Sequence, residues 1–268
     1  MSEFAGRTAV ITGGESGIGR ATARQLARAG ARVFIGDAHL LPENRAEFQQ
    51  LGITSRYCDV RTEKPLQQLI DDAVAATGRL DILVNNAGIG LVKPITDVTE
   101  AEWDACMDIN VKGAFFGCKH AVKHMQRLGG GAIVNTASNA GLLPRVHDPV
   151  YSISKQALIA LTKTIALCHS GERIRVNAVC PGPVGDTGMM NSDLAQAADR
   201  EQAVRDRIAA SPLAKAWGRM ITPEEVAEAI CYLASDAARM VTGTSLAIDG
   251  GKALGVPPVF ESTAAVVS

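Results

Sequence analysis

The sequence predicts an α/β fold, a doubly wound parallel sheet of about seven strands with helices on both faces. Short apolar runs rich in β-formers alternate with longer amphipathic stretches along most of the chain. A glycine-rich turn follows the first of these runs. Parallel strands need crossover connections of a dozen or more residues, and the amphipathic stretches supply them.

Each predicted strand is a short apolar run, most about five residues long, and each predicted helix is an amphipathic stretch between two runs. The strands are Thr8–Thr12, Arg32–Gly36, Thr54–Cys58, Leu80–Asn85, Ala132–Ala137, Arg175–Val179 and Ser245–Ile248. The helices are Ile18–Ala29, Glu43–Leu51, Lys64–Thr77, Glu100–Leu128, Val150–His169 and Pro223–Ser235. Ligands of such sheets bind outside the carboxyl ends of the strands, so residues that follow strands are the candidates for a site.

Two segments depart from this alternation, within what we expect to be a single domain, residues 1–268. Residues 183–220 carry no predicted strand but contain a polar helical run, Asp193–Ala210, and are predicted to form a lid. The tail, residues 252–268, contains Pro257 and Pro258 and is predicted to be irregular.

Composition excludes several classes of function. Hydrophobic residues make up 47% of the chain, enough for a core, and 27 Lys and Arg nearly balance 28 Asp and Glu, which argues against nucleic acid. The chain shows no apolar stretch of the roughly 18 residues that span a bilayer and no signal segment, so we expect no membrane partner and a cytoplasmic protein. The six cysteines lack metal-ligand spacing and are expected to be buried, reduced thiols, with no metal site.

The glycine-rich turn, TGGESGIG at residues 12–19, stands between the first strand and the first helix. Glycines let the backbone turn tightly and let a pyrophosphate reach the N–H groups at the start of the helix. The pattern is weak evidence by itself, and its position is what makes it specific. It predicts a dinucleotide-phosphate site, unless the glycines serve only the turn, at Gly13, Ser16, Gly17, Ile18 and Gly19.

Asp37 ends the second strand, 18 residues beyond Gly19. A carboxylate there can accept hydrogen bonds from both adenosine ribose hydroxyls and would repel a 2′-phosphate, which predicts NAD as the cofactor. The alternative is a turn or helix-capping role before Pro42.

Tyr151 and Lys155 are spaced to lie on one helix face, about 6 Å apart at Cβ. An ammonium beside a phenol favours the phenolate, so we expect the pKa of Tyr151 to fall from near 10, which suits a general acid/base.

Taken together, these motifs resemble the short-chain dehydrogenase/reductase family over nearly the whole chain, with a Rossmann-like fold. Ser138 precedes Tyr151 by 13 residues, as in the family's pattern. The resemblance is carried by residues 12–19, Asp59-Val60, Asn85-Asn86-Ala87-Gly88, Asn110, Ser138, Tyr151 with Lys155, Pro181-Gly182 and Asp249-Gly250-Gly251.

The resemblance implies a role for each matching residue. Tyr151 would be the general acid/base, Ser138 would hydrogen-bond the reacting oxygen, and Lys155 would lower the pKa of Tyr151 and hold the nicotinamide ribose. Asn110 would keep a water in the proton relay. Standing alone, Ser138 would be read as a turn hydroxyl and Asn110 as a solvated helix residue. Further cofactor contacts would come from Asp59 and Val60 at the adenine, from Asn86, Ala87 and Gly88, and from Pro181, Gly182 and Val184.

The predicted reaction is hydride transfer between NAD(H) and a secondary alcohol or ketone, a small-molecule alcohol or carbonyl substrate. The alternatives are a catalytically silent NAD(H)-binding sensor or scaffold, and a lyase or epimerase-like enzyme with a tightly bound cofactor. Thr187 stands one residue later than the family's x-Val-x-Thr pattern, which leaves its contact with the cofactor open.

The substrate is not named by the sequence. Arg145 and His147, between Ser138 and Tyr151, could orient a polar or anionic group, or could be solvated loop residues. An apolar wall, which could equally be packing on the body, would come from Met189, Met190, Leu213, Trp217 and Met220.

The predicted helix Val150–His169 is apolar around most of its circumference, so it needs cover on two sides. A second copy of the chain could cover the outer side, together with the helix at 100–128 and its Phe115 and Phe116. The family resemblance implies a homotetramer of D₂ symmetry.

Overall fold

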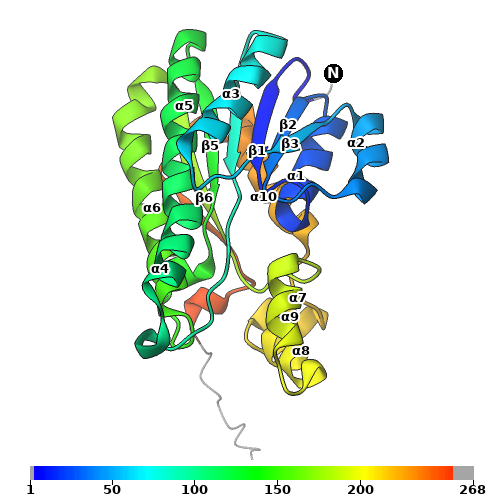
Figure 1. The fold of residues 1–268 in the computed structure, drawn as a ribbon, viewed down its shortest axis with the longest axis vertical. Helices are drawn as coiled ribbons and strands as arrows, with labels where there is room; N and C mark the ends of the chain where they lie inside the picture. The colour runs from blue at the N-terminus through cyan, green and yellow to red at the C-terminus, as the bar shows by residue number, and fades with distance from the viewer. Residues whose placement is uncertain (1–2, 256–268) are drawn as a thin grey trace, which may run out of the picture.

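The computed structural model describes residues 3–255, in which seven strands form one sheet (Figure 1). The strand order is β3-β2-β1-β4-β5-β6-β7, and every neighbouring pair is parallel. The doubly wound parallel sheet predicted from the sequence is therefore confirmed. The strands are β1 (Thr8–Thr12), β2 (Arg32–Asp37), β3 (Thr54–Tyr57), β4 (Ile82–Asn85), β5 (Gly131–Thr136), β6 (Ile174–Pro181) and β7 (Ser245–Ile248).

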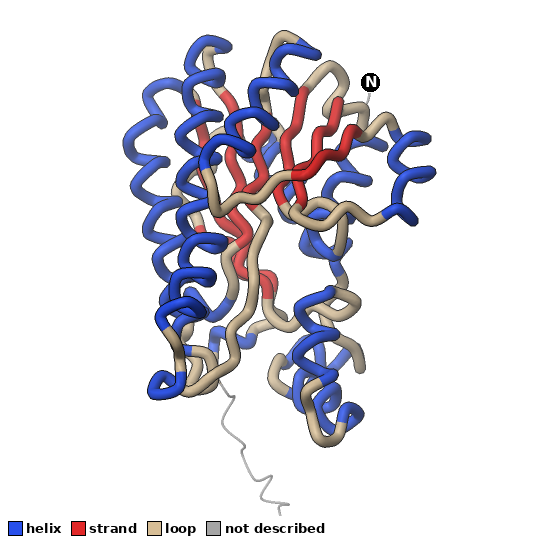
Figure 2. The backbone as a smooth tube through the Cα atoms, viewed as in Figure 1, coloured by secondary structure: helices blue, strands red, loops and turns tan. Residues whose placement is uncertain are grey.

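Helices cover both faces of the sheet (Figure 2). One face carries α1 (Gly17–Arg28), α2 (Arg45–Leu51) and α10 (Pro223–Ala234), and the other carries α3 (Glu63–Thr77), α4 (Glu100–Met107), α5 (Gly113–Leu128) and α6 (Pro149–His169). Alternation along β1 assigns Ala9 and Ile11 to the core under α1 and α10, and Val10 to the core under α3 and α5. This is the period-2 pattern that a strand buried on both faces requires.

The chain reverses direction across the sheet between β1 and β4. From β1 it runs outward through α1 to β2 and on to β3, and α3 then returns it to β4 on the other side of β1. At such a reversal the loops that follow β1 and β4 diverge and leave a crevice at the carboxyl ends of the strands.

One predicted helix has an unexpected interruption. The stretch predicted as a helix at 100–128 consists of α4, a turn of π-helix (Asp108–Lys112) and α5, with right-handed helical dihedral angles through both junctions. Asn110 lies in the π turn and is buried there, not solvated. Such insertions are common at functional sites.

The lid segment is three short helices where the sequence analysis predicted one helical run. They are α7 (Gly188–Ala195), α8 (Arg200–Ala209) and α9 (Pro212–Trp217), and they project beyond the carboxyl ends of the strands (Figure 1). The run breaks because the Asp199 side chain accepts a hydrogen bond from Gln202 N and starts a new helix. A parallel bridge between Val184 and Ile221 closes the base of the segment.

Further predictions from the sequence concern membrane-spanning helices, metal ligands, cysteines and the tail. Among residues 3–255, no helix is both long and apolar enough to cross a bilayer, and no group of three metal-ligating side chains comes together. All six cysteines are free, but Cys168 is exposed and Cys231 is partly exposed, so the expectation of buried thiols was wrong for these two. In the tail, Lys252–Leu254 form a 3₁₀ turn, and residues 256–268 lie outside the described part of the chain.

Candidate active site

A cavity of about 850 Å³ lies at the carboxyl ends of the strands. One end is lined by Asp37, the last residue of β2, and by Asp59, which follows β3, and the other end by Met189 and Met190 of the lid. Most of the predicted site residues line it: Gly13, Ser16, Gly17, Ile18, Asp59, Val60, Asn86, Ala87, Gly88, Ser138, Tyr151, Lys155, Pro181, Gly182 and Val184. Gly19 and Asn110 do not.

The glycine-rich turn has the shape that a pyrophosphate needs. Gly13 has φ +65°, and a Cβ there would lie 2.9 Å from Ala87 Cα, so only glycine fits between the two loops. At Gly19 a Cβ would lie 2.1 Å from Gly13 O, so this glycine lets α1 approach the turn but does not face the cavity. The Ser16 side chain makes no capping hydrogen bond within the described chain, which leaves the first N–H groups of α1 for a ligand.

Asn86 ties the loop after β4 to this turn. Its Nδ2 donates to Gly13 O at 2.9 Å and to Thr12 O at 3.2 Å, while Asn86 N and Ala87 N donate to Thr12 Oγ1 at 3.1 Å each. These bonds hold the two walls of the crevice at a fixed separation, as a dinucleotide site requires.

The Asp37 carboxylate is ordered by two backbone donors, Glu15 N at 3.1 Å and His39 N at 3.0 Å. Sequence reasoning missed Glu15, which is buried and accepts hydrogen bonds from Asn44 Nδ2 at 2.7 Å, from Leu41 N at 3.3 Å and from the Ser55 hydroxyl. Glu15 thereby fastens the turn to the segment after β2.

Asp59 and Val60 line the same end of the cavity, as predicted. Arg61 donates to both carboxylate oxygens of Asp59 and holds the pKa of that carboxyl below its usual value. The Arg61 cation at this end of the cavity is therefore already engaged by a carboxylate.

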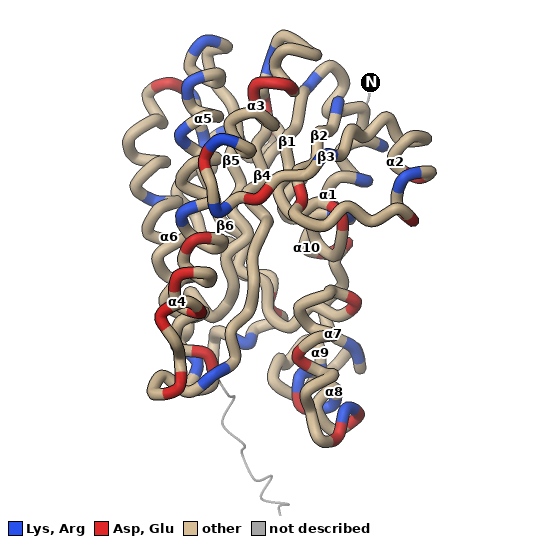
Figure 3. Tube along the Cα trace, viewed as in Figure 1, with Lys and Arg blue, Asp and Glu red and all other residues tan. Residues whose placement is uncertain are grey.

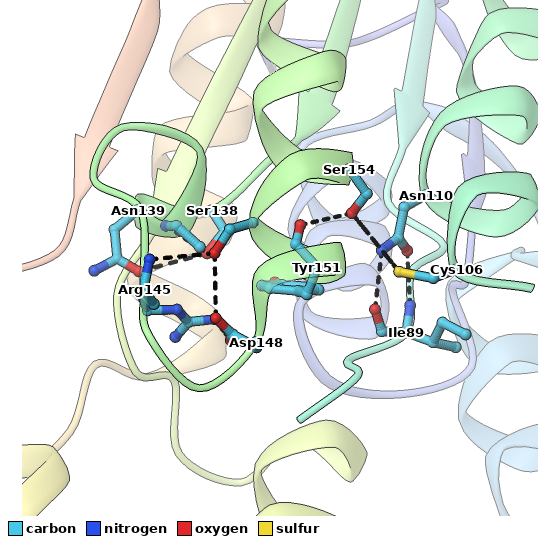
Figure 4. A network of polar contacts seen from close by, with 11 residues as sticks. Ile89, Cys106, Asn110, Ser138, Asn139, Arg145, Asp148, Tyr151 and Ser154 are labelled. Carbon is cyan, nitrogen blue, oxygen red and sulfur yellow. Dashed lines mark hydrogen bonds and ion pairs between the residues drawn. The ribbon is translucent and has the colours of Figure 1, made fainter. Parts of the chain in front are cut away.

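The catalytic candidates Ser138, Tyr151 and Lys155 line the same cavity, and Figure 4 shows the first two. Tyr151 and Lys155 occupy successive turns at the start of α6, and Ser138 follows β5. All three are buried, and the Lys155 ammonium lies 5.6 Å from the Tyr151 ring centroid while donating to Thr136 O at 2.9 Å.

Burial is the largest influence on both titratable groups. It raises the pKa of Tyr151, against the smaller effects of a hydrogen bond from Ser138 and of the Arg145 charge, which lower it. The predicted fall in the pKa of Tyr151 was therefore wrong in direction, because desolvation of the phenolate outweighs the Ser138 hydrogen bond and the Arg145 charge. Burial also lowers the pKa of Lys155 to about 8.

Asn110 acts on the loop after β4. Its Oδ1 accepts from Ile89 N at 2.9 Å, and its Nδ2 donates to Ile89 O at 3.0 Å and to Ser154 Oγ at 3.0 Å. Gly88 is the point of close approach, because a Cβ there would lie 3.1 Å from Asn110 Oδ1 and 3.3 Å from Lys155 Nζ. Figure 4 shows this network on one side of Tyr151, and Ser138, Arg145 and Asp148 on the other.

Arg145 and His147 both line the cavity. Arg145 forms an ion pair with the buried Asp148, and its guanidinium lies 5.3 Å from the Tyr151 ring centroid. Arg145 is thus an engaged side chain and not a solvated loop residue.

The predicted apolar wall is only partly present. Met189 and Met190 line the cavity, whereas Leu213, Trp217 and Met220 are absent from its described lining. Thr187 also lines it, with its methyl group next to Gly17, and caps α7 by accepting from Met190 N at 3.2 Å. The extra residue before Thr187 is accommodated by Asp186 in the left-handed region, at φ +52°.

The lid end of the cavity holds charged residues that sequence reasoning missed: Asp193, Arg207 and Lys252. They lie in the lid and the tail, which carry no motif, and only the folded chain brings them beside the Tyr151 wall. A count of charges in the predicted lid could have marked Asp193 and Arg207 as candidates.

A parallel doubly wound sheet with a glycine turn, an acidic residue at the end of β2 and a crevice at the strand reversal is typical of a dinucleotide-binding protein. The chain matches the family described as Enoyl-(Acyl carrier protein) reductase over residues 13–253. It belongs to the short-chain dehydrogenase/reductase family, and it is an oxidoreductase of that family.

Three similar proteins illustrate the match. Cis-4-hydroxycyclohexanecarboxylate dehydrogenase of Sinomonas cyclohexanicum is 42% identical over 92% of this chain and 97% of its own length. An uncharacterized oxidoreductase of Thermotoga maritima is 37% identical over 92% of this chain and 98% of its own. The crystal structure of levodione reductase superposes with a TM-score of 0.87 at 30% identity, covering 94% of this chain and 100% of that one.

Proposed function

We propose that the protein transfers a hydride between NAD(H) and a secondary alcohol or its ketone. The observation that carries the proposal is a single cavity lined both by the buried Tyr151, with Ser138 and Lys155, and by the glycine-rich turn at residues 12–19. The similarity to a dehydrogenase named for a hydroxycyclohexane acid supports an alcohol as the reacting group.

The side chains would divide the proton chemistry between them. Tyr151 Oη gives its proton to the ketone oxygen or takes it from the alcohol, while Ser138 Oγ hydrogen-bonds the same oxygen. Burial keeps Tyr151 protonated, so it is ready to act as the acid in reduction. In the reverse direction the Lys155 ammonium stabilises the phenolate across the desolvated gap. The nicotinamide supplies or accepts the hydride at the carbinol carbon.

Asn110 would support this relay from behind the cavity wall. The oxygen of its side-chain amide accepts from Ile89 and the nitrogen donates to Ile89 and Ser154, so its proposed role is to hold the loop after β4 against α6. The proposed relay set is therefore Asn110, Ser138, Tyr151 and Lys155.

NAD is the proposed cofactor. Asp37 faces the cavity as a carboxylate ordered by Glu15 N and His39 N, ready to accept bonds from ribose hydroxyls. Arg61 is engaged by Asp59 and is not available to a 2′-phosphate without breaking that pair. The proposed cofactor contacts are Gly13, Ser16, Gly17, Ile18, Asp37, Asp59, Val60, Asn86, Ala87, Gly88, Tyr151, Lys155, Pro181, Gly182 and Val184, with Gly19 shaping the turn.

The test is the consumption of NADH with a panel of aliphatic, cyclic, steroidal and sugar-like ketones, followed by absorbance. Turnover of one ketone, and of the matching alcohol with NAD, supports the proposal. A silent sensor would bind NADH, seen by fluorescence, and consume none with any ketone. An enzyme of the lyase or epimerase kind would convert substrate without a net change in added NADH.

Assembly and location are part of the same proposal. Phe115 and Leu167, on α5 and α6, are exposed apolar side chains, and a shallow apolar hollow beside them is lined by Met107, Val111, Phe116 and Leu161. A homotetramer would cover this face. Six free cysteines are compatible with the cytoplasm, where thiols stay reduced.

A further inference from the structure

The lid end of the cavity carries two cationic side chains without an anionic partner. Arg145 also lies there, but the buried Asp148 already pairs with it. Among residues 3–255, the side chains of Arg207 and Lys252 form no ion pair within 4.0 Å and no hydrogen bond, although both line the cavity. Such groups are available to a ligand.

The turn that carries Lys252 is fixed by hydrogen bonds within itself and by one from Ser211, at the start of α9. The Asp249 carboxylate accepts from Gly251 N at 2.9 Å and from Ala253 N at 2.8 Å, which fixes the turn that carries Lys252. Ser211 Oγ donates to Asp249 O at 2.6 Å. The backbone of Lys252 is thus an anchored point of the cavity wall.

Arg207 belongs to the lid. It lies on α8, a helix that falls wholly within the described residues and has no buried residue. Basic and acidic residues alternate along this helix (Figure 3). A ligand group that joined Arg207 to Lys252 would therefore connect a loosely packed helix to the anchored turn.

The two cations are close enough to act on each other. Burial lowers the pKa of Lys252, and the charges of Arg145 and Arg207 lower it further. Asp193, on α7, is the nearby anion, but burial raises the pKa of its carboxyl, against the lowering effects of Arg207 and Arg145. An additional anion would relieve the repulsion between Lys252 and Arg207.

We propose that Arg207 and Lys252 bind a carboxylate of the substrate, at the lid end of the cavity and remote from the hydroxyl or ketone that meets Tyr151. The inference rests on the proposed function and assigns it a substrate class, hydroxy acids and keto acids. An arginine fork and a lysine ammonium are the side chains that hold carboxylates most strongly. Binding of this group draws α8 toward the turn at 249–253 and shields the reacting centre from water.

The first test compares acids with their neutral esters. The probes are 4-hydroxypentanoate and 5-hydroxyhexanoate, each beside its methyl ester, with NAD as co-substrate. For the better acid we expect kcat/KM at least about 10-fold above that of its ester, carried mainly by KM. Esters that react as well as both acids would refute the carboxylate site and leave the proposed function intact.

The second test uses charge-neutral variants with matched controls. Arg207→Gln and Lys252→Gln should each lower kcat/KM for the acid about 10-fold and change that of the ester less than about 2-fold. Arg205→Gln, also on α8 but outside the described lining of the cavity, and Lys215→Gln on α9 should leave both unchanged. Asp193→Asn, which removes the competing anion, should lower KM for the acid.

A binding measurement separates the possible failures. Quenching of bound NADH fluorescence by 5-hydroxyhexanoate reports on the carboxylate site even if no alcohol is oxidised, in which case only the proposed function fails. If Arg207→Gln and Lys252→Gln weaken the binding of NADH as much as the binding of the acid, the two cations serve the cofactor and the inference is wrong. If neither variant changes the acid's affinity, the inference is also wrong.

Discussion

The two walls of the cavity are built in opposite ways. On the body side, Ser138, Tyr151 and Lys155 of the wall and Asn110 behind it are between 1% and 7% exposed. They lie just after β5, on α6 and in the π turn. On the lid side, the only buried residues of α7, α8 and α9, which lie wholly inside the described chain, are Leu194 and Ala214.

This difference separates chemistry from selection. A proton donor has to be positioned to within a fraction of an ångström, and dense packing of regular elements provides that precision. A segment with few buried contacts opens at low cost and admits sequence change without loss of the fold. Substitutions on the body wall should therefore change turnover, whereas those on the lid should change selectivity or nothing.

Tyr151→Phe should have the largest effect. Loss of the hydroxyl removes the general acid/base, so we expect turnover to fall at least ~10²-fold. NADH affinity and the melting temperature should stay near those of the wild type, because the ring is retained. Tyr57→Phe, at an exposed position on β3, is the control and should be fully active. A Tyr151→Phe enzyme with normal turnover would remove the body wall from the chemistry.

Lys155→Met should lower activity and raise stability at the same time. Loss of the ammonium should reduce turnover on the order of 10²-fold. Because burial holds the pKa of Lys155 at about 8 against 10.5 in the unfolded chain, the native state carries fewer protons between these values. The free energy of unfolding contributed by this residue therefore rises with pH from about 8 to 10.5, and its penalty is complete below pH 8.

Denaturant unfolding of both proteins across pH 7 to pH 10 measures that penalty. At pH 7 the Met variant should be more stable by roughly 3–4 kcal/mol, since the pKa of Lys155 falls from 10.5 to about 8 and one pKa unit corresponds to about 1.4 kcal/mol. The difference should shrink as the pH rises. A Met variant that is less stable at pH 7 would show that the Lys155 bond to Thr136 O outweighs the cost of burial.

The features that the sequence predicted correctly are those that depend on short-range sequence pattern. β1 and β7 begin and end at the predicted residues, because the side-chain pattern of a strand can be recognised from consecutive residues alone. The predicted cofactor residues, Gly19 excepted, line one cavity because parallel strands present their carboxyl ends at one edge.

What the sequence did not predict depends on distant partners. Glu15 is buried only because Asn44 and Ser55 reach it from 29 and 40 residues away. In the π turn, the Asn110 side chain forms hydrogen bonds with both the N–H and the C=O of Ile89. No residue spacing within the helix indicates this turn. The rise in the pKa of Tyr151 likewise comes from tertiary burial, which the spacing of Tyr151 and Lys155 does not report.

Asp37→Ala should have an intermediate effect, on choice of cofactor alone. Removing a carboxylate that accepts ribose hydroxyls and repels a 2′-phosphate should reduce the ratio of kcat/KM for NAD over NADP on the order of 10-fold. Turnover at saturating NAD should change little, because the residue is far along the cavity from Tyr151. Asp97→Ala, outside the described lining of the cavity, is the matched control. Equal kcat/KM for the two cofactors in the wild type would already contradict the assignment of Asp37.

Trp217→Ala should have the smallest effect, although tryptophan is usually an anchor of a binding site. Trp217 is 72% exposed at the end of α9, and Arg219 Cζ lies 5.6 Å from the centroid of its ring. A cation–π contact at an exposed position stabilises by about 0.5–1 kcal/mol. We therefore expect a loss in stability of less than about 1 kcal/mol and a change in KM of less than about 2-fold, measured by thermal melting and steady-state kinetics. Trp103→Ala on α4, away from the lid, provides the reference for a surface tryptophan. If Trp217→Ala instead raised KM about 10-fold with an unchanged melting temperature, the lid would bring this ring onto the substrate as it closes. Substrate selectivity would then depend on contacts formed only in the closed state. The exposed lid wall would in that case position the substrate as closely as the buried wall positions the proton donor.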